Sequence, residues 1–116
     1  MADARSTGRR SQAFWQELEQ AVAVHLASRG WDAQINAASR IVDIVASKRN
    51  RPTRYVQVKA SEAGERVWPD AADVGRLATA AAHHSGVGVV ALVKRRGARW
   101  QISYFSADTG VKVDAD

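Results

Sequence analysis

The chain has 116 residues, which is enough for one compact domain and too few for two ordinary ones. With 46% hydrophobic and 25% charged residues it can build a core, and no apolar run is long enough for a membrane-spanning helix. The absence of cysteine excludes disulfides, thiolate metal sites and cysteine nucleophiles. No hydrophobic segment follows the basic start, so we expect no secretory signal and a cytoplasmic protein.

The charge is strongly basic and unevenly distributed. Seventeen basic residues against 12 acidic ones give a net charge of +5, and 13 of the basic residues are arginines. Arginine suits phosphate better than lysine because its planar guanidinium binds through two hydrogen bonds. The basic residues form three clusters: Arg5, Arg9 and Arg10; Lys48, Arg49, Arg51 and Arg54; and Lys94, Arg95, Arg96 and Arg99. We therefore predict a nucleic-acid partner and a nucleoid-associated location; the alternative is that these clusters are solvated turns.

The first half of the chain is predicted to contain one helix and three strands. From residue 11 to residue 29 apolar side chains recur at helical spacing, and Gly30 follows as a C-terminal stop. Residues 55–60 alternate between apolar and polar, as in a strand with one buried face. In chain order we predict a flexible basic arm (1–10), a helix (11–29), a strand (31–36), a small polar loop (37–40), a buried strand (41–47), a basic turn (48–52) and a strand (55–60).

The second half adds one helix and two strands. Residues 87–93 are almost all apolar, as expected of a strand covered on both faces. In chain order we predict a polar loop (61–69), a helix that begins at Asp70 and ends before Gly86, a strand (87–93), a basic hairpin turn (94–98), a strand (99–105) and a loose tail (106–116). The order α-β-β-β-α-β-β predicts a single α/β domain over residues 11–105, with a mixed sheet flanked by helices.

Three polar side chains fall where the core of the sheet is expected. Gln57 and Lys59 share one face of their strand, and Asp43 lies in the preceding strand among aliphatic residues. A buried carboxylate is costly unless it meets a cation, which here is either Lys59 in a simple ion pair or a divalent metal. Glu19 lies closer than Glu17 to the apolar stripe of the first helix, so it can join Asp43 and provide the oxygen ligands that Mg²⁺ prefers.

The series Glu19, Asp43 and Gln57-Val58-Lys59, on helix, strand and strand, resembles the PD-(D/E)XK nucleases, which have the restriction-endonuclease-like fold. Within that superfamily the chain is most similar to the archaeal-type Holliday junction resolvases, small proteins with a basic N-terminal arm and a glutamate on the first helix. The similarity covers roughly residues 9–105 and extends through the second helix and the last two strands.

The resemblance implies a metal-dependent endonuclease that cleaves branched DNA, above all four-way junctions, with no organic cofactor and no membrane partner. It makes Glu19, Asp43, Gln57 and the Val58 backbone carbonyl ligands of Mg²⁺, for which Mn²⁺ can substitute, and it makes Lys59 the residue that positions the attacking water. A junction needs two symmetric cuts, so the resemblance also implies a homodimer. The implied DNA contacts are Arg9, Arg10, Ser39, Arg40, Lys48, Arg49, Arg51, Arg54, Arg95 and Arg96.

The sequence departs from the family pattern at two positions. Gln57 replaces the usual glutamate, and Val42 replaces the proline that usually precedes the aspartate. Glutamine keeps an oxygen ligand but removes one negative charge, so metal affinity should fall unless Glu62 supplies a carboxylate. A one-turn shift of the alignment favours Glu17 over Glu19. The alternatives are a DNA-binding module with a weakened site on the same fold and a nuclease for another DNA structure.

Overall fold

The structure, a computed structural model, describes residues 12–36, 41–61 and 68–116, so the predicted arm at 1–10 and loop at 37–40 lie outside it. Neither helix in these ranges has the length and apolar character needed to cross a membrane. The described elements are α1 (Gln12–Ser28), β1 (Asp32–Ile35), β2 (Ile44–Lys48), β3 (Arg51–Ser61), α2 (Ala71–His83), β4 (Val87–Arg96), β5 (Arg99–Ser106) and β6 (Lys112–Val113). The predicted order of elements is therefore present, with one strand added at the end.

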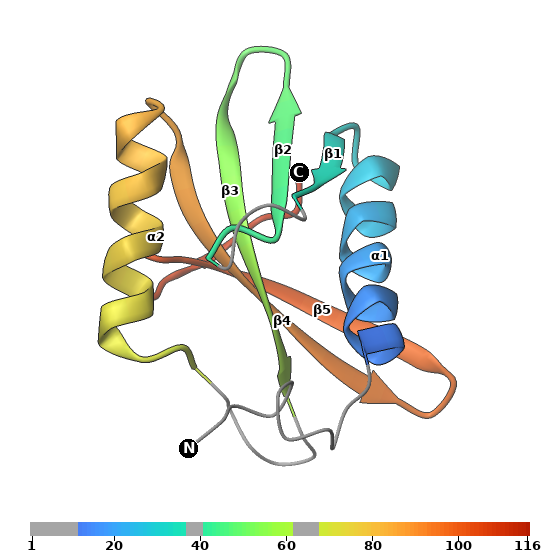
Figure 1. The fold of residues 1–116 in the computed structure, drawn as a ribbon. Helices are drawn as coiled ribbons and strands as arrows, with labels where there is room; N and C mark the ends of the chain where they lie inside the picture. The colour runs from blue at the N-terminus through green and yellow to red at the C-terminus, as the bar shows by residue number, and fades with distance from the viewer. Residues whose placement is uncertain (1–11, 37–40, 62–67) are drawn as a thin grey trace.

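The described strands form one mixed sheet whose order follows the chain, β1-β2-β3-β4-β5-β6 (Figure 1). Neighbouring strands are antiparallel except for β3 and β4, which are parallel. Parallel neighbours need a long crossover connection, and α2 lies in the connection between these two strands. In their register Gln57 stands beside Val90 and Lys59 beside Leu92, which places the predicted site residues on an inner strand.

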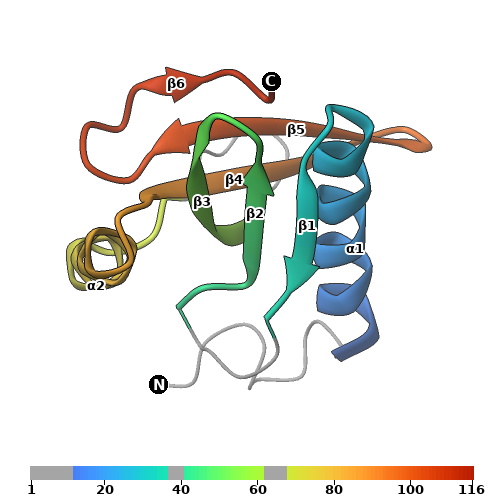
Figure 2. The ribbon, with the colours of Figure 1, turned by 90° about the horizontal axis from the view of Figure 1, so that it is seen from above.

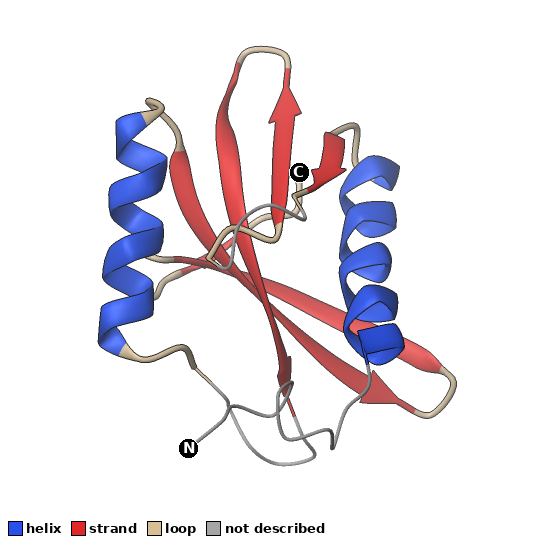
Figure 3. Ribbon diagram, viewed as in Figure 1, coloured by secondary structure: helices blue, strands red, loops and turns tan. Residues whose placement is uncertain are grey.

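Each helix packs against one face of the sheet, and Figures 2 and 3 show the strands between α1 and α2. The larger core joins Leu18, Val22 and Leu26 of α1 to alternate residues of the strands, including Val56 and Val58. The smaller core joins Leu77 of α2 to Val90 and Leu92 on the other face. Because side chains alternate along a strand, Gln57 and Lys59 point to the α2 face of the sheet.

Both helices begin or end at the residues that the sequence indicates. Gly30 has φ +94°, a conformation that favours glycine, and its N–H donates to Ala27 O at 3.0 Å to close the end of α1. Asp70 is the N-cap of α2, and its carboxylate accepts a hydrogen bond of 2.8 Å from the Asp73 N–H.

Two boundaries correct the sequence interpretation. The strand predicted at 41–47 begins only at Ile44, so Asp43 lies directly before β2 rather than inside it. The segment 106–116, predicted to be a loose tail, contains β6, which pairs with β5 through Tyr104–Val113 and Phe105–Lys112. This pairing uses backbone hydrogen bonds and needs no apolar pattern, which explains why the composition of the segment gave no indication of it.

Gly86 makes the closest backbone approach of the described glycines. A Cβ at this position would stand 2.5 Å from Thr53 O and 2.5 Å from Tyr55 Cε2. We expect Gly86→Ala to lower the free energy of unfolding by about 1–3 kcal/mol, because the backbone oxygen cannot move aside cheaply. Gly75→Ala is the matched control: its Cβ would meet nothing within 4 Å, and alanine favours the helix by about 1 kcal/mol. Urea unfolding of both variants checks this; equal stability of the two would contradict it.

Candidate functional site

Asp43 is buried and is fixed by hydrogen bonds to the backbone of neighbouring residues at one end of the sheet. Its N–H donates to Val56 O and its carbonyl accepts from the Asn36 N–H, both at 2.8 Å. Its carboxylate Oδ2 accepts a further hydrogen bond of 2.8 Å from the Val58 N–H, and the residue is 4% exposed. The carboxylate is therefore fixed on the backbone N–H of Val58, the residue that lies between Gln57 and Lys59 in the chain.

Gln57 and Lys59 lie on either side of Val58, on the same face of β3. Gln57 is 5% exposed, and its Oε1 accepts no hydrogen bond from any described residue. A buried acceptor without a donor costs about 1–3 kcal/mol, so this oxygen is suited to a cation. Lys59 is half-buried, and within the described ranges it forms no ion pair with Asp43. The described contact of the buried Asp43 carboxylate is the hydrogen bond from the Val58 N–H.

The oxygen donors fit a hard divalent cation. The N–H and C=O of a strand residue point to the same side, so the Val58 carbonyl faces the edge at which its N–H meets Asp43. Carboxylate, amide and backbone carbonyl oxygens are the donors that Mg²⁺ accepts. Among the described residues no cluster of three acidic, cysteine or histidine side chains suits a metal.

On α1, the two candidate glutamates differ in burial. Glu17 is exposed, whereas Glu19 is half-buried. Glu19 lies one turn from both Trp15 and Ala23, which are buried against the sheet, so it stands at the border of the packed face. This agrees with the position that the helical spacing indicates.

The predicted DNA contacts on the β2–β3 hairpin are largely engaged within the protein. Three of them surround the buried indole of Trp31, and we call Trp31, Lys48, Arg51 and Arg54 the Trp31 cluster. The cations lie 5.5 Å (Lys48), 5.9 Å (Arg51) and 4.5 Å (Arg54) from the ring centroid. Lys48 Nζ also donates to Arg29 O at 2.7 Å, and only Arg49 of the predicted contacts here makes no such interaction among the described residues.

The C-terminal segment completes the Trp31 cluster. Arg54 is 8% exposed and donates from Nη1 to Asp114 O at 2.6 Å, while Trp31 Nε1 donates to Ala115 O at 2.8 Å. Burial, and next the charge of Arg51, lowers the pKa of Arg54 from its ordinary value. Arg54 therefore holds the end of the chain, and its burial does not suit a DNA contact. Nothing in the sequence indicated that Trp31 is a platform for cations, because its partners lie far away in the chain, on the β2–β3 hairpin and in the C-terminal segment.

The β4–β5 hairpin separates its arginines between the two faces of the sheet. Arg95 stands opposite Trp100 and lies 4.9 Å from its ring. Arg96 stands opposite Arg99, and its Nε donates to Gln101 Oε1 at 3.0 Å. Both arginines are exposed at the end of the hairpin. The other predicted contacts (Arg9, Arg10, Ser39 and Arg40) lie outside the described residues.

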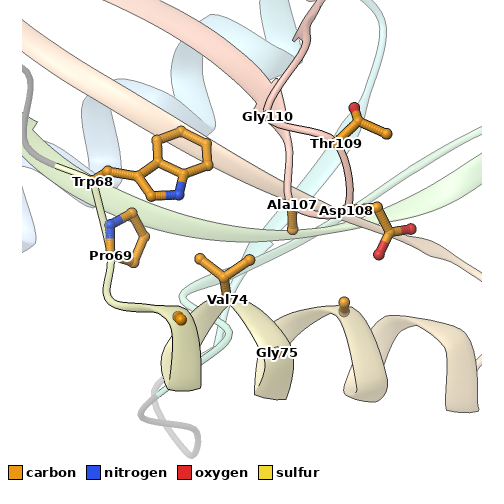
Figure 4. A pocket seen from close by; sticks show the side chains of 10 residues that line it. Trp68, Pro69, Val74, Gly75, Ala107, Asp108, Thr109 and Gly110 are labelled. Atoms are coloured by element: carbon orange, nitrogen blue, oxygen red, sulfur yellow. The ribbon is translucent and has the colours of Figure 1, made fainter.

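A hollow of about 520 Å³ lies between α2 and the segment that follows β5 (Figure 4). Trp68 and Val74 line one side, and Asp108 and Thr109 line the other. Trp68 also packs edge-on against Phe105 with ring centroids 5.8 Å apart. None of the predicted site residues lines this hollow.

The mixed sheet flanked by α1 and α2, with Asp43 directly before β2 and Gln57-Val58-Lys59 on β3, defines the restriction-endonuclease-like fold predicted from the sequence. Among solved structures the chain is similar to Hjc, a Holliday junction resolvase from Archaeoglobus fulgidus, an archaeal hyperthermophile. The TM-score is 0.65, with 26% sequence identity, and the match covers 80% of this chain and 72% of that chain. No family model and no curated protein matches the chain. The resemblance to the archaeal-type resolvases is confirmed.

Proposed function

We propose that the chain is a metal-dependent endonuclease that cleaves branched DNA, with the four-way Holliday junction as its substrate. The observation that carries the proposal is the Asp43 carboxylate, fixed on the Val58 N–H between Gln57 and Lys59. The similarity to a Holliday junction resolvase supports the substrate class. The net charge of +5 supports a polyanionic partner.

Asp43, Gln57 Oε1 and the Val58 carbonyl would hold Mg²⁺ or Mn²⁺. Glu19, on the helix that packs on the opposite face from Gln57, would have to reach the ion at the edge where Asp43 meets β3. Such an ion, when bound, polarises the scissile phosphate and lowers the pKa of a bound water. Asp43 and Gln57 fix the position of the ion in the sheet, since both are buried. The Lys59 ammonium lies on the same face as Gln57 and would hold the attacking water and oppose the charge that develops on the phosphate.

A homodimer would supply the two active sites that symmetric cleavage of a junction requires. Exposed cations such as Arg49 and Arg96 would contact phosphates, so binding should weaken steeply with salt and vary little with sequence. Such a protein would act in the cytoplasm, associated with the nucleoid.

Gln57 determines the strength of the metal site in this proposal. We expect Gln57→Glu to tighten Mn²⁺ binding by about tenfold, because a carboxylate restores one negative charge to a buried oxygen site. Calorimetric titration of Mn²⁺ into the wild type and the variant measures this without reference to catalysis. Gln57→Leu is the matched control, since it removes the oxygen and keeps the approximate volume, and it should bind more weakly than the wild type. Equal affinity of all three proteins would contradict the assignment.

A second candidate is a DNA-binding module with an inactive site, and the neutral Gln57 is the observation that favours it. Incubation of the wild type with a labelled synthetic four-way junction, with Mg²⁺, with Mn²⁺ and with a chelator, separates the two functions. The proposal predicts metal-dependent incision at symmetric positions. Binding without incision at any metal concentration would establish the binding module, and preferential incision of nicked or flapped duplex would establish another substrate.

A further inference from the structure

The α2 face of the sheet carries a row of cations that begins at the proposed catalytic lysine. Lys59 on β3 stands beside Leu92 on β4, and Ser61 stands beside Lys94. Alternation along β4 then places Leu92, Lys94 and Arg96 on one face, and Arg99 of β5 is the cross-strand partner of Arg96. We call Lys59, Lys94, Arg96 and Arg99 the cation stripe.

Strand geometry sets the spacing of the cation stripe. Adjacent strands lie about 4.8 Å apart and two residues along a strand span about 6.6 Å, so the Cα atoms of Lys59 and Lys94 are separated by about 8 Å. Arg96 follows Lys94 after about another 6.6 Å. The stripe is thus about 15 Å long, which matches about four phosphates of one DNA strand at about 3.4 Å of helix axis per phosphate.

The charges of the cation stripe are available to a ligand. Arg96 and Arg99 are exposed, and Lys94 is half-buried. Strands β4 and β5 contain no acidic residue, and none of these cations forms an ion pair within the described ranges. The Trp31 cluster differs, because its cations stack on the indole or donate hydrogen bonds to the backbone carbonyls of Arg29 and Asp114.

The β4–β5 hairpin also extends past α1 in Figures 1 and 2, so it projects from the body of the molecule.

We infer that one duplex arm of the DNA substrate lies along the cation stripe, with the phosphate backbone running from Lys59 out along the α2 face of the β4–β5 hairpin. The inference rests on the proposed function, to which it adds the path of the substrate. It divides neighbouring arginines by face: Arg96 contacts phosphate, whereas Arg95, which stacks on Trp100 on the α1 face, does not.

The test measures the affinity of the chain for a fluorescent four-way junction in a chelating buffer, over a series of salt concentrations. We expect Arg96→Gln to weaken binding several-fold and to reduce the slope of log K against log salt by about 0.9, and R96Q/R99Q to reduce it by about 1.8. Arg95→Gln removes the same charge from the adjacent residue and should leave the slope unchanged. R49Q/R51Q removes two charges from the β2–β3 hairpin and should have a smaller effect than R96Q/R99Q.

Equal salt slopes for Arg95→Gln and Arg96→Gln, in a protein whose wild type binds the junction, would contradict the proposed DNA path along the cation stripe. This result would not contradict the proposed nuclease function. A larger effect of R49Q/R51Q than of R96Q/R99Q would also overturn it, by assigning the duplex to the other hairpin. Failure of the wild type to bind any DNA would overturn both the path and the proposed function. Because the substituted side chains are exposed, we expect every variant to be as stable as the wild type. Unfolding curves of each variant check this and separate weak binding from loss of fold.

Discussion

Asp43→Asn is expected to reduce the rate of junction cleavage by about 10²–10³-fold or more while leaving junction binding intact. The substitution removes a negative charge from the proposed metal site and keeps an oxygen that can accept the Val58 N–H, so the hydrogen bond of 2.8 Å can persist. The loss should appear in single-turnover cleavage with Mg²⁺ or Mn²⁺. Affinity in a chelating buffer should match that of the wild type.

Lys59→Met provides the companion variant for Asp43→Asn. It keeps the length of the side chain and removes the ammonium, so it should also abolish cleavage, but it should retain Mn²⁺ binding because a lysine is no ligand. Wild-type cleavage by Asp43→Asn would place the active site elsewhere on the molecule. Loss of binding together with cleavage would show that Asp43 supports the fold rather than the chemistry.

Trp31→Ala is expected to lower the free energy of unfolding by about 3–5 kcal/mol, the largest stability effect that we predict. Trp31 is 3% exposed, and its loss would remove the platform of the Trp31 cluster and the hydrogen bond to Ala115 O. The guanidinium of Arg54, which now lies between the Trp31 ring and the Asp114 carbonyl, would lose its contact with the indole. A buried charge that loses a contact lowers the stability of the fold. Urea unfolding followed by circular dichroism gives the free energy.

Trp31→Phe separates the two contributions of the indole. It keeps an aromatic ring for the cations and removes the N–H that donates to Ala115 O, so it should cost about 1 kcal/mol or somewhat more. Both variants should bind junction DNA as the wild type does wherever they are folded. A stable Trp31→Ala protein that no longer binds DNA would show instead that the cluster faces the substrate.

The periodicity of the sequence was sufficient for the helices and the central strands. Alternation over 55–60 predicted that Gln57 and Lys59 share a face, and the register of β3 and β4 confirms it. Helical spacing favoured Glu19 over Glu17, in agreement with their burial. These features are local, because they depend on which side of a regular element a residue occupies.

Features that depend on distant contacts could not be predicted in the same way. Arg54 was expected to contact DNA because it belongs to a basic cluster of the sequence, yet Trp31 and the Asp114 carbonyl, far away in the sequence, enclose it. The segment 106–116 looked loose because it is small and polar, and its pairing with β5 depends on backbone groups. The placement of Arg95 and Arg96 on opposite faces of the sheet emerged only from the register of β4 and β5.

Anomalous diffraction from a crystal grown with Mn²⁺ tests the metal site most directly. Our account predicts a peak coordinated by the Asp43 carboxylate, Gln57 Oε1 and the Val58 carbonyl, with the Glu19 carboxylate turned toward it and the Lys59 ammonium close by. A crystal with Mn²⁺ bound elsewhere, or with Gln57 Oε1 hydrogen-bonded to the protein and no ion beside Asp43, would contradict the account.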